Sequence, residues 1–129
     1  MDTDRPSSET RDSLYDLYVR ERLIARGGRV RALHREAVAL VCAHAQSEAL
    51  RRIEESLTGP EADVVRRARN AHQSPPRHAD AGEYHRATGL EALIGYLYVT
   101  GQRDRMDALM GQALPHELFE TSDGMKSMN

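Results

Sequence analysis

One stretch of this sequence, DAGEYHRATGLEALIGYLYVT from Asp80 to Thr100, constrains the fold more than any other. It predicts a single helix, because Asp80 is a suitable N-cap with Glu83 three residues later, as in a capping box, and Gly101 follows as a stop. Apolar residues recur at helical spacing and predict a core face: Leu90, Leu93, Ile94, Leu97 and Tyr98. A second stripe is small, which predicts that another backbone comes close: Ala81, Thr88, Ala92 and Gly95.

Glu91 lies between these two stripes. From Ala87 to Gly101 it is the only ionisable carboxylate, and this interval contains no Lys or Arg. A buried carboxylate without a partner is costly, so we expect Glu91 to find one elsewhere in the fold, and a metal ion is one candidate. The alternative is that Glu91 only points into solvent from an exposed strip.

The composition indicates a single all-α domain. The chain has 129 residues, of which 40% are hydrophobic and 5% aromatic, and it has no Trp. Good helix formers dominate and β-branched residues are few, which favours helices over strands. We therefore expect one helical domain over residues 1–129, with flexible ends at 1–7 and 116–129.

Charge and cysteine usage limit the function classes. The formal net charge of -2 argues against a basic nucleic-acid-binding tail, although Lys126 is the only Lys among 18 basic residues. A GC-rich genome would explain that bias, but arginine forks suit phosphate in either case. The single cysteine, Cys42, excludes an internal disulfide, fits a reducing cytoplasm and lies in an apolar run typical of a core. No apolar run approaches the length of a membrane span and no signal peptide is present, so we expect a cytoplasmic protein without membrane contact.

Four further helical segments are predicted around this stretch. The first should bury seven apolar residues, including Leu17 and Ile24, and the second is long enough to require a break near Ala43 to Gln46. Thr58 and Glu61 form a capping box at the start of the third. The predicted ranges are about Ser8 to Ala25, Val30 to Leu57, Pro60 to about Ala71, and Gln102 to Leu114.

Two groups of charged residues suggest chemistry. Asp12 and Asp16 stand one helical turn apart, although acids near a helix N-terminus also simply suit its dipole. The interval from Val64 to Ala79 has no acid and contains the basic residues Arg66, Arg67, Arg69, His72, Arg77 and His78. It runs from a helix end into a proline-containing loop, with Arg86 beyond, and could lie along a phosphate backbone. The alternative is a solvated loop with incidental charge.

Acids on two helices and an arginine-rich loop together suit phosphodiester hydrolysis. Carboxylates hold magnesium, which polarises phosphate and activates water, while arginines hold the nucleic acid. Here the sequence resembles Mini-III, the compact bacterial form of ribonuclease III, from about Asp12 to Met110. The resemblance rests on segments that fall in order: LYDLYVRERLIARG, LHREAVALVCAHAQSEAL, LTGPEADVVRRARNA and YHRATGLEALIGYLYVTGQRDRMDALM.

The resemblance implies an all-α ribonuclease III-like domain that forms a homodimer and cuts double-stranded RNA with Mg2+. The family's first acidic motif matches Arg11 to Asp16 and its second matches Thr88 to Leu93. By this correspondence Asp12 and Glu91 are the catalytic, metal-binding pair, and Asp16 is an auxiliary acid. The RNA-binding residues that we expect from the basic segment and its surroundings are Arg66, Arg67, Arg69, Asn70, Arg77 and Arg86. The family also suggests a ribosomal RNA precursor as the substrate, and hence a role in ribosome biogenesis.

The chain departs from the family pattern before its first acid. Arg11 stands where the family has a glycine, and the preceding residues Met1 to Thr10 are polar rather than apolar. We therefore expect a first helix that is shortened, misplaced or read from a late start codon, and a weakened enzyme with a higher magnesium requirement. Two alternative functions stay open: a duplex-RNA-binding dimer that cuts poorly, and a helical interaction domain without any RNA role.

Overall fold

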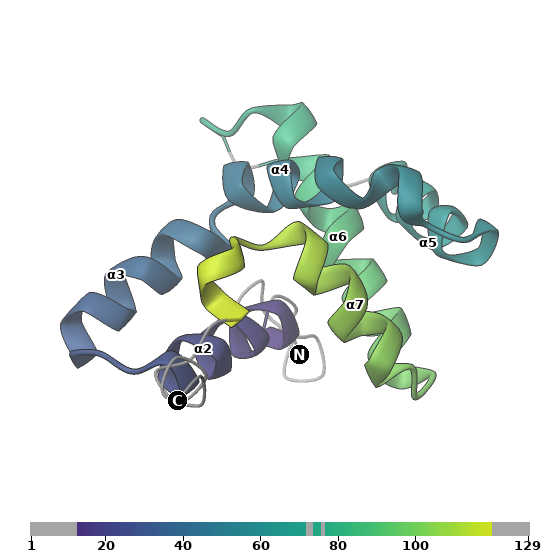
Figure 1. Ribbon diagram of the computed structural model, residues 1–129. Helices are drawn as coiled ribbons and strands as arrows, with labels where there is room; N and C mark the ends of the chain where they lie inside the picture. The colour runs from purple at the N-terminus through teal and green to yellow at the C-terminus, as the bar shows by residue number, and fades with distance from the viewer. Residues whose placement is uncertain (1–12, 72–73, 76, 120–129) are drawn as a thin grey trace, which may run out of the picture.

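The computed structural model describes residues 13–71, 74–75 and 77–119 (Figure 1). These residues form α-helices and short 3-10 helices and contain no strand, which confirms the predicted all-α class. In chain order the elements are α2 (Ser13–Arg26), α3 (Val30–Val41), α4 (Ala43–Ile53), η2 (Glu54–Ser56), α5 (Gly59–Arg69), α6 (Ala81–Val99), α7 (Arg103–Ala113) and η3 (His116–Phe119). None of the described helices is long and apolar enough to cross a bilayer.

Helix α6 is the centre of the fold. It packs most extensively against α4 and α5 and also contacts α2 and α7 (Figure 1). Its predicted core residues Leu90, Leu93, Ile94 and Leu97 are buried, but Tyr98 is 48% exposed, so that part of the prediction is wrong. Tyr98 lies in the last turn, where α6 extends past the neighbours that cover its middle. The Asp80 carboxylate accepts from the Glu83 backbone N–H at 2.9 Å, and Gly101 (φ 74°) follows the helix, as predicted.

The long helical stretch after Val30 is broken at Cys42, one residue before the predicted interval. Cys42 adopts an extended conformation (φ -70°, ψ 161°) between α3 and α4. Its side chain is exposed and its thiol donates to the Ala39 carbonyl at 3.4 Å, so the expected core position is wrong. The corner between the two helices explains this, since a residue there is covered by neither helix.

Helix α2 buries fewer residues than its composition suggests. Tyr15, Tyr18, Val19 and Leu23 are buried, whereas Leu17 is 54% and Ile24 67% exposed, contrary to the prediction. Seven apolar residues are more than one helix face can hold, and Leu17 follows Tyr15 by two positions, about 200° around the axis. Helix α2 therefore carries an exposed apolar strip on the side that faces away from the core.

A close approach between two helices occurs at Gly89 and not at Gly95, the glycine of the predicted small stripe. A Cβ atom at Gly89 would meet Val65 Cγ1 and Arg69 Cγ of α5 at 3.0 Å each, and the Val65 carbonyl oxygen at 3.4 Å. At Gly95 no atom of the described residues outside α6's own backbone lies within 4 Å of the same position. Within this chain, then, α5 approaches α6 at Gly89, and the stripe at Gly95 faces open space.

This contrast gives a paired stability prediction. Gly89→Ala and Gly95→Ala both gain the helix propensity of alanine, so their difference isolates the contact with α5. We expect Gly89→Ala to be less stable than Gly95→Ala by about 1–3 kcal/mol, the usual cost of overpacking. Urea unfolding followed by circular dichroism measures this difference. Equal free energies of unfolding for the two variants would contradict the close approach.

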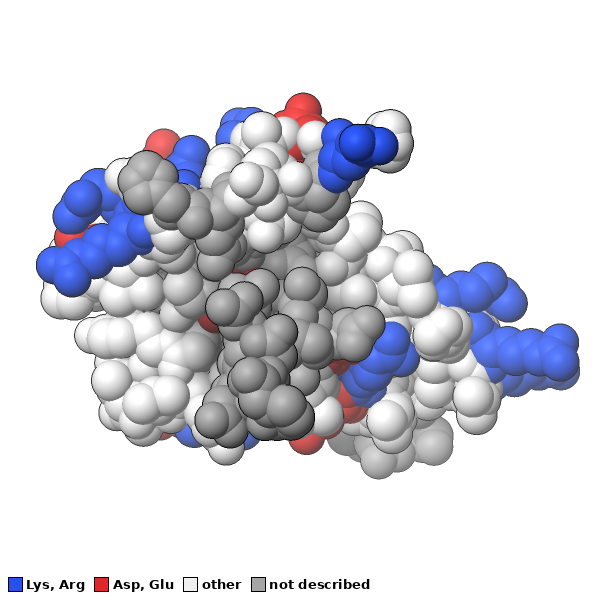
Figure 2. All heavy atoms as spheres, turned by 180° about the vertical axis from the view of Figure 1, so that it is seen from behind, with Lys and Arg blue, Asp and Glu red and all other residues white. Residues whose placement is uncertain are grey.

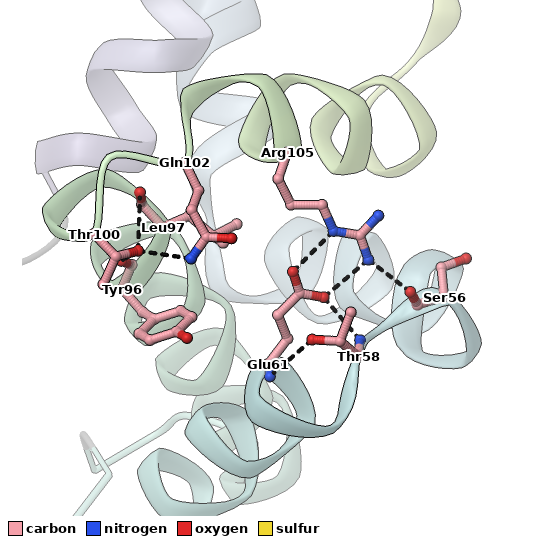
Figure 3. Close-up of polar contacts among 8 residues, drawn as sticks. All are labelled: Ser56, Thr58, Glu61, Tyr96, Leu97, Thr100, Gln102 and Arg105. Atoms are coloured by element: carbon pink, nitrogen blue, oxygen red, sulfur yellow. Dashed lines mark hydrogen bonds and ion pairs between the residues drawn. The ribbon is translucent and has the colours of Figure 1, made fainter.

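The C-terminal elements close the core. Met106, Leu109, Met110 and Leu114 are buried as predicted. The stretch 116–129, expected to be flexible, is described to Phe119, and there η3 buries Leu118. The turn into α7 is held by Thr100, whose hydroxyl donates to the Tyr96 carbonyl at 2.7 Å and accepts from the Gln102 amide at 2.8 Å (Figure 3). This turn fixes the start of α7 to the end of α6.

Candidate active site

Glu91 lies in the third turn of α6 on a side that other helices partly cover. The residue is half-buried, and both of its carboxylate oxygens are buried. It is close enough to Tyr15 of α2 for its charge to raise the pKa of that phenol, after the larger effect of burial itself. The alternative that Glu91 simply points into solvent is therefore wrong.

Tyr15 forms the wall of the site on the α2 side. It is fully buried, and its hydroxyl lies 3.5 Å from the Leu40 carbonyl of α3, toward which it donates. Its raised pKa keeps the phenol protonated at physiological pH. The sequence predicted Tyr15 as a core residue but not as a neighbour of the acid, because periodicity within α2 carries no information about which residue of α6 it meets.

Of the two acids predicted to accompany Glu91, the structure describes only Asp16. Asp12 lies outside the described residues. Asp16 is half-buried and accepts from Arg20 Nε, one turn along α2, at 2.5 Å. Among the described residues no group of three His, Cys, Asp or Glu side chains could hold a metal ion. Magnesium commonly uses only one or two carboxylates together with water and substrate phosphate, so Glu91 with Asp12 is a donor set of the right chemistry.

Two arginines of the predicted basic segment form ion pairs with a neighbouring acid, which neutralises part of the segment's positive charge. Arg66 and Arg67 both pair with Asp63, with Arg67 Nε at 2.9 Å from its carboxylate. Asp63 immediately precedes the interval that contains no acid, so counting charges within that interval overestimated its positive character. The two guanidinium groups are nevertheless exposed, with relative side-chain areas of 64% and 76%.

Three of the predicted RNA-binding residues line one pocket. Its volume is ≈300 Å³, and it lies between η2 and α5. Arg69 reaches across it toward Glu54, with 3.5 Å between guanidinium and carboxylate, and its stem packs on Gly89. The lining residues are Glu54, Leu57, Ala62, Val65, Arg66, Arg69 and Asn70. The structure thus brings Arg66, Arg69 and Asn70 together.

Arg77 and Arg86, the two predicted RNA-binding arginines not yet described, also lie apart from this pocket. Arg77 is exposed in the connection before α6. Arg86 is half-buried, and its Nε donates to the hydroxyl of Ser47, a fully buried residue of α4, at 2.5 Å. Close by, the His44 ring of α4 pairs with the Glu83 carboxylate at 2.5 Å, and this contact raises the pKa of His44. Arg86 and Glu83 therefore both tie the first half of α6 to α4.

Basic side chains on the molecular surface form separate groups. Figure 2 shows groups of them toward opposite sides of one face, over the α5 end and over the α3 end. Gly89, which contacts Arg69, and Glu91 are two positions apart, so they point about 200° apart around the α6 axis. The contact with α5 and the acid thus lie on different sides of α6, joined by the helix itself.

Comparisons with known proteins identify the family. The family model of the ribonuclease III domain matches residues 12–102. Mini-ribonuclease 3 of Symbiobacterium thermophilum is 48% identical over 104 residues, covering 79% of this chain and 80% of that protein. Mini-ribonuclease 3 of a Thermoanaerobacter species is 40% identical over 101 residues, covering 77% and 71%. A crystal structure of a Fusobacterium nucleatum protein superposes with a TM-score of 0.72 at 27% identity, covering 78% of this chain and 79% of that one.

These matches are long enough and similar enough in sequence to assign the chain to a family. The matched residues include all of α2 to α6, and hence Tyr15, the α5 arginines and Glu91. The curated relatives match over most of both lengths, so the similarity is not confined to one motif. The ribonuclease III family acts on double-stranded RNA and generally uses a divalent metal ion. The chain therefore belongs to the ribonuclease III domain family of endoribonucleases and resembles its Mini-ribonuclease 3 members over most of its length.

Proposed function

We propose that this protein is a magnesium-dependent endoribonuclease that hydrolyses phosphodiester bonds in double-stranded RNA, with Asp12 and Glu91 as its catalytic, metal-binding pair. One observation carries the proposal: Glu91 has buried carboxylate oxygens in the middle of the central helix, within the region that matches the family. Buried charged groups in proteins are paired or coordinate metal ions. A role in holding a cation gives a reason for its presence.

The residues of this chain divide the work around that acid. Bound magnesium supplies Lewis-acid chemistry, namely polarisation of phosphate and a lowered pKa of water. Asp12 and Glu91 would hold the ion, and the acid Asp16 would assist from the next turn of α2. Tyr15, neutral and buried, keeps α2 packed against Glu91 and excludes water from that side. The burial of the Glu91 oxygens strengthens their interaction with a cation.

The RNA-binding part of the proposal rests on the surface of α5 and the connection that follows. An A-form duplex is recognised mainly through its shape, phosphates and 2′-hydroxyls, for which exposed guanidinium groups are suited. The exposed arginines there are Arg66, Arg67 and Arg77, while Arg69 and Asn70 line the pocket at the end of α5. Arg86 contributes by holding α6 in place through Ser47 rather than from an exposed position.

Removing two of these arginines should weaken binding in a salt-dependent way. For Arg67→Ala/Arg77→Ala we expect the affinity for duplex RNA to fall and the slope of log affinity against log salt to flatten by about two. Fluorescence anisotropy at several ionic strengths, without divalent metal, measures both. The double variant Arg51→Ala/Arg103→Ala removes the same charge from other exposed positions and should match the wild type. Equal slopes for the two double variants would reject this surface.

A two-fold dimer is the assembly we propose. One chain supplies one pair of acids, and cutting both strands of a duplex requires two such centres facing opposite strands. Exposed apolar residues on α2 and α6 favour self-association, among them Leu17 and Tyr98, and the face at Gly95 is open to a close neighbour. Light scattering at micromolar concentration should report twice the chain mass. A strict monomer that still makes paired cuts would contradict the proposal.

We propose that the substrate is a ribosomal RNA precursor in the cytoplasm, as the resemblance to the family suggests. Incubation of labelled duplex RNA with and without magnesium distinguishes the candidate functions. Magnesium-dependent cleavage supports the endoribonuclease, whereas binding without cleavage would favour the RNA-binding dimer. Absence of both would leave a helical interaction domain. A duplex DNA of the same sequence is the control, and its cleavage at the same rate would contradict a requirement for RNA.

A further inference from the structure

A buried ion pair joins the start of α5 to α7. Glu61, three residues into the capping box of α5, is 3% exposed, and its two carboxylate oxygens accept from Arg105 Nε at 2.8 Å and Nη2 at 2.9 Å (Figure 3). The same Arg105 nitrogen donates to the Ser56 carbonyl at 2.7 Å, and the Thr58 backbone N–H donates to Glu61 at 2.8 Å. Arg105 thus holds the end of η2 and the first turn of α5 together.

Helix α5 packs extensively against α6, but few of its own side chains are buried. Val65 is its one buried apolar residue, and this residue packs at the close approach to Gly89. Glu61 lies one turn before Val65 and Arg69 lies one turn after it, so Glu61 and Arg69 are about 12 Å apart along the axis. A helix whose single buried apolar side chain lies near its middle can tilt about that point. Fixing Glu61 therefore also fixes the opposite end, where the pocket-lining Arg66, Arg69 and Asn70 lie.

Arg105 is itself fixed relative to α6. Helix α7 begins directly after the turn in which Thr100 bonds both the Tyr96 carbonyl and the Gln102 amide (Figure 3). Its buried residues Met106, Leu109 and Met110 hold it on the core. The ion pair thus relates α5 to the helix that carries Glu91.

We propose that Arg105, through Glu61, is a positioning residue for RNA binding: it sets the direction of α5 and so places Arg66, Arg69 and Asn70 relative to Glu91. This inference rests on the proposed function. Arg105 reaches the arginines only through α5, and Glu91 has its own supports in α4 and α2. Disturbing the pair should therefore affect the hold on RNA more than the chemical step.

Arg105→Lys is the test, because an ammonium group keeps the charge but cannot form the two-pronged contact while also reaching Ser56. We expect the dissociation constant for duplex RNA, measured without divalent metal, to rise about five- to tenfold, and the salt slope to flatten by about one. The KM should rise with it, while kcat at saturating RNA and magnesium stays within about twofold. Glu61→Gln should act in the same direction. Arg103→Lys, on the same helix but exposed, is the matched control and should behave as wild type.

The split between KM and kcat separates positioning from mere stability. All assays are made at a temperature where circular dichroism shows each variant folded. A variant with a lowered melting temperature but wild-type affinity, salt slope and KM would overturn the inference, as would a kcat that falls while KM is unchanged. Duplex RNA that the wild-type chain neither binds nor cuts would instead overturn the proposed function, and this inference with it.

Discussion

Replacing Glu91 by Gln should lower the rate of RNA cleavage by about a thousandfold or more, because a bound metal ion contributes several kcal/mol to transition-state stabilisation and each 1.36 kcal/mol is a factor of ten. Gln keeps the size of the side chain and removes its charge. We therefore expect the fold to tolerate the change. Single-turnover cleavage at saturating magnesium measures the rate, and Asp12→Asn should behave in the same way.

The control for this prediction is another acid of the same type. Glu48→Gln removes a half-exposed carboxylate of α4 that pairs with Arg51 on the surface. Its cleavage rate should equal that of the wild type. Binding of duplex RNA to Glu91→Gln without metal should persist or tighten, since a negative charge near phosphate is lost. Cleavage by Glu91→Gln at the wild-type rate would remove Glu91 from the catalytic pair.

Arg105→Ala should have the largest effect on stability of any change predicted for this chain. It leaves the buried Glu61 carboxylate without its guanidinium partner, and because the Arg105 side chain is 32% exposed we expect a loss of about 2–3 kcal/mol, at the low end for breaking a buried pair. Urea unfolding measures the loss, with Arg103→Ala as the control for removing an exposed arginine from α7. A loss in the free energy of unfolding no larger than that of Arg103→Ala would show that the pair contributes nothing to the stability of the fold.

The same pair predicts how stability depends on pH. Arg105 holds the pKa of Glu61 below its ordinary value of 4.5, and the backbone contact with Thr58 adds to this effect. A carboxyl group whose pKa is lowered by folding stabilises the protein above the unfolded-state pKa, and that stability is lost as the pH falls through the folded-state pKa. The difference in melting temperature between wild type and Arg105→Ala should therefore be large at pH 6 and shrink below pH 4.5. A difference that stays constant with pH would contradict the ionic origin.

Local signals explain the parts of the fold that could be predicted. The Asp80 cap, the Gly101 stop and the Thr58–Glu61 capping box each depend on residues within one helical turn. The break in the second helical stretch followed from its excessive length. The core face of α6 followed from periodicity, because α6 is covered along most of its length.

Most of the misses concern contacts between distant segments. Nothing near Glu61 indicates that its partner is Arg105, 44 residues later. The same limit applies to Gly89, which proved to be the close contact although Gly95 has an equal claim by sequence. For Glu91, spacing indicated an isolated acid, but only the fold shows its oxygens buried and Tyr15 nearby. The placing of Asp63 beside Arg66 and Arg67 was a local signal that charge counting passed over.

A titration of the folded protein with manganese tests most directly whether Glu91 holds a divalent metal ion. It requires no cleavage assay. Manganese is a paramagnetic substitute for magnesium and broadens the NMR signals of nearby nuclei. We expect the amide signals of residues 88–94 and of Tyr15 to broaden first, to recover with excess magnesium, and to stay sharp in Glu91→Gln. Equal broadening of these signals in wild type and Glu91→Gln, or broadening confined to other parts of the chain, would contradict the assignment.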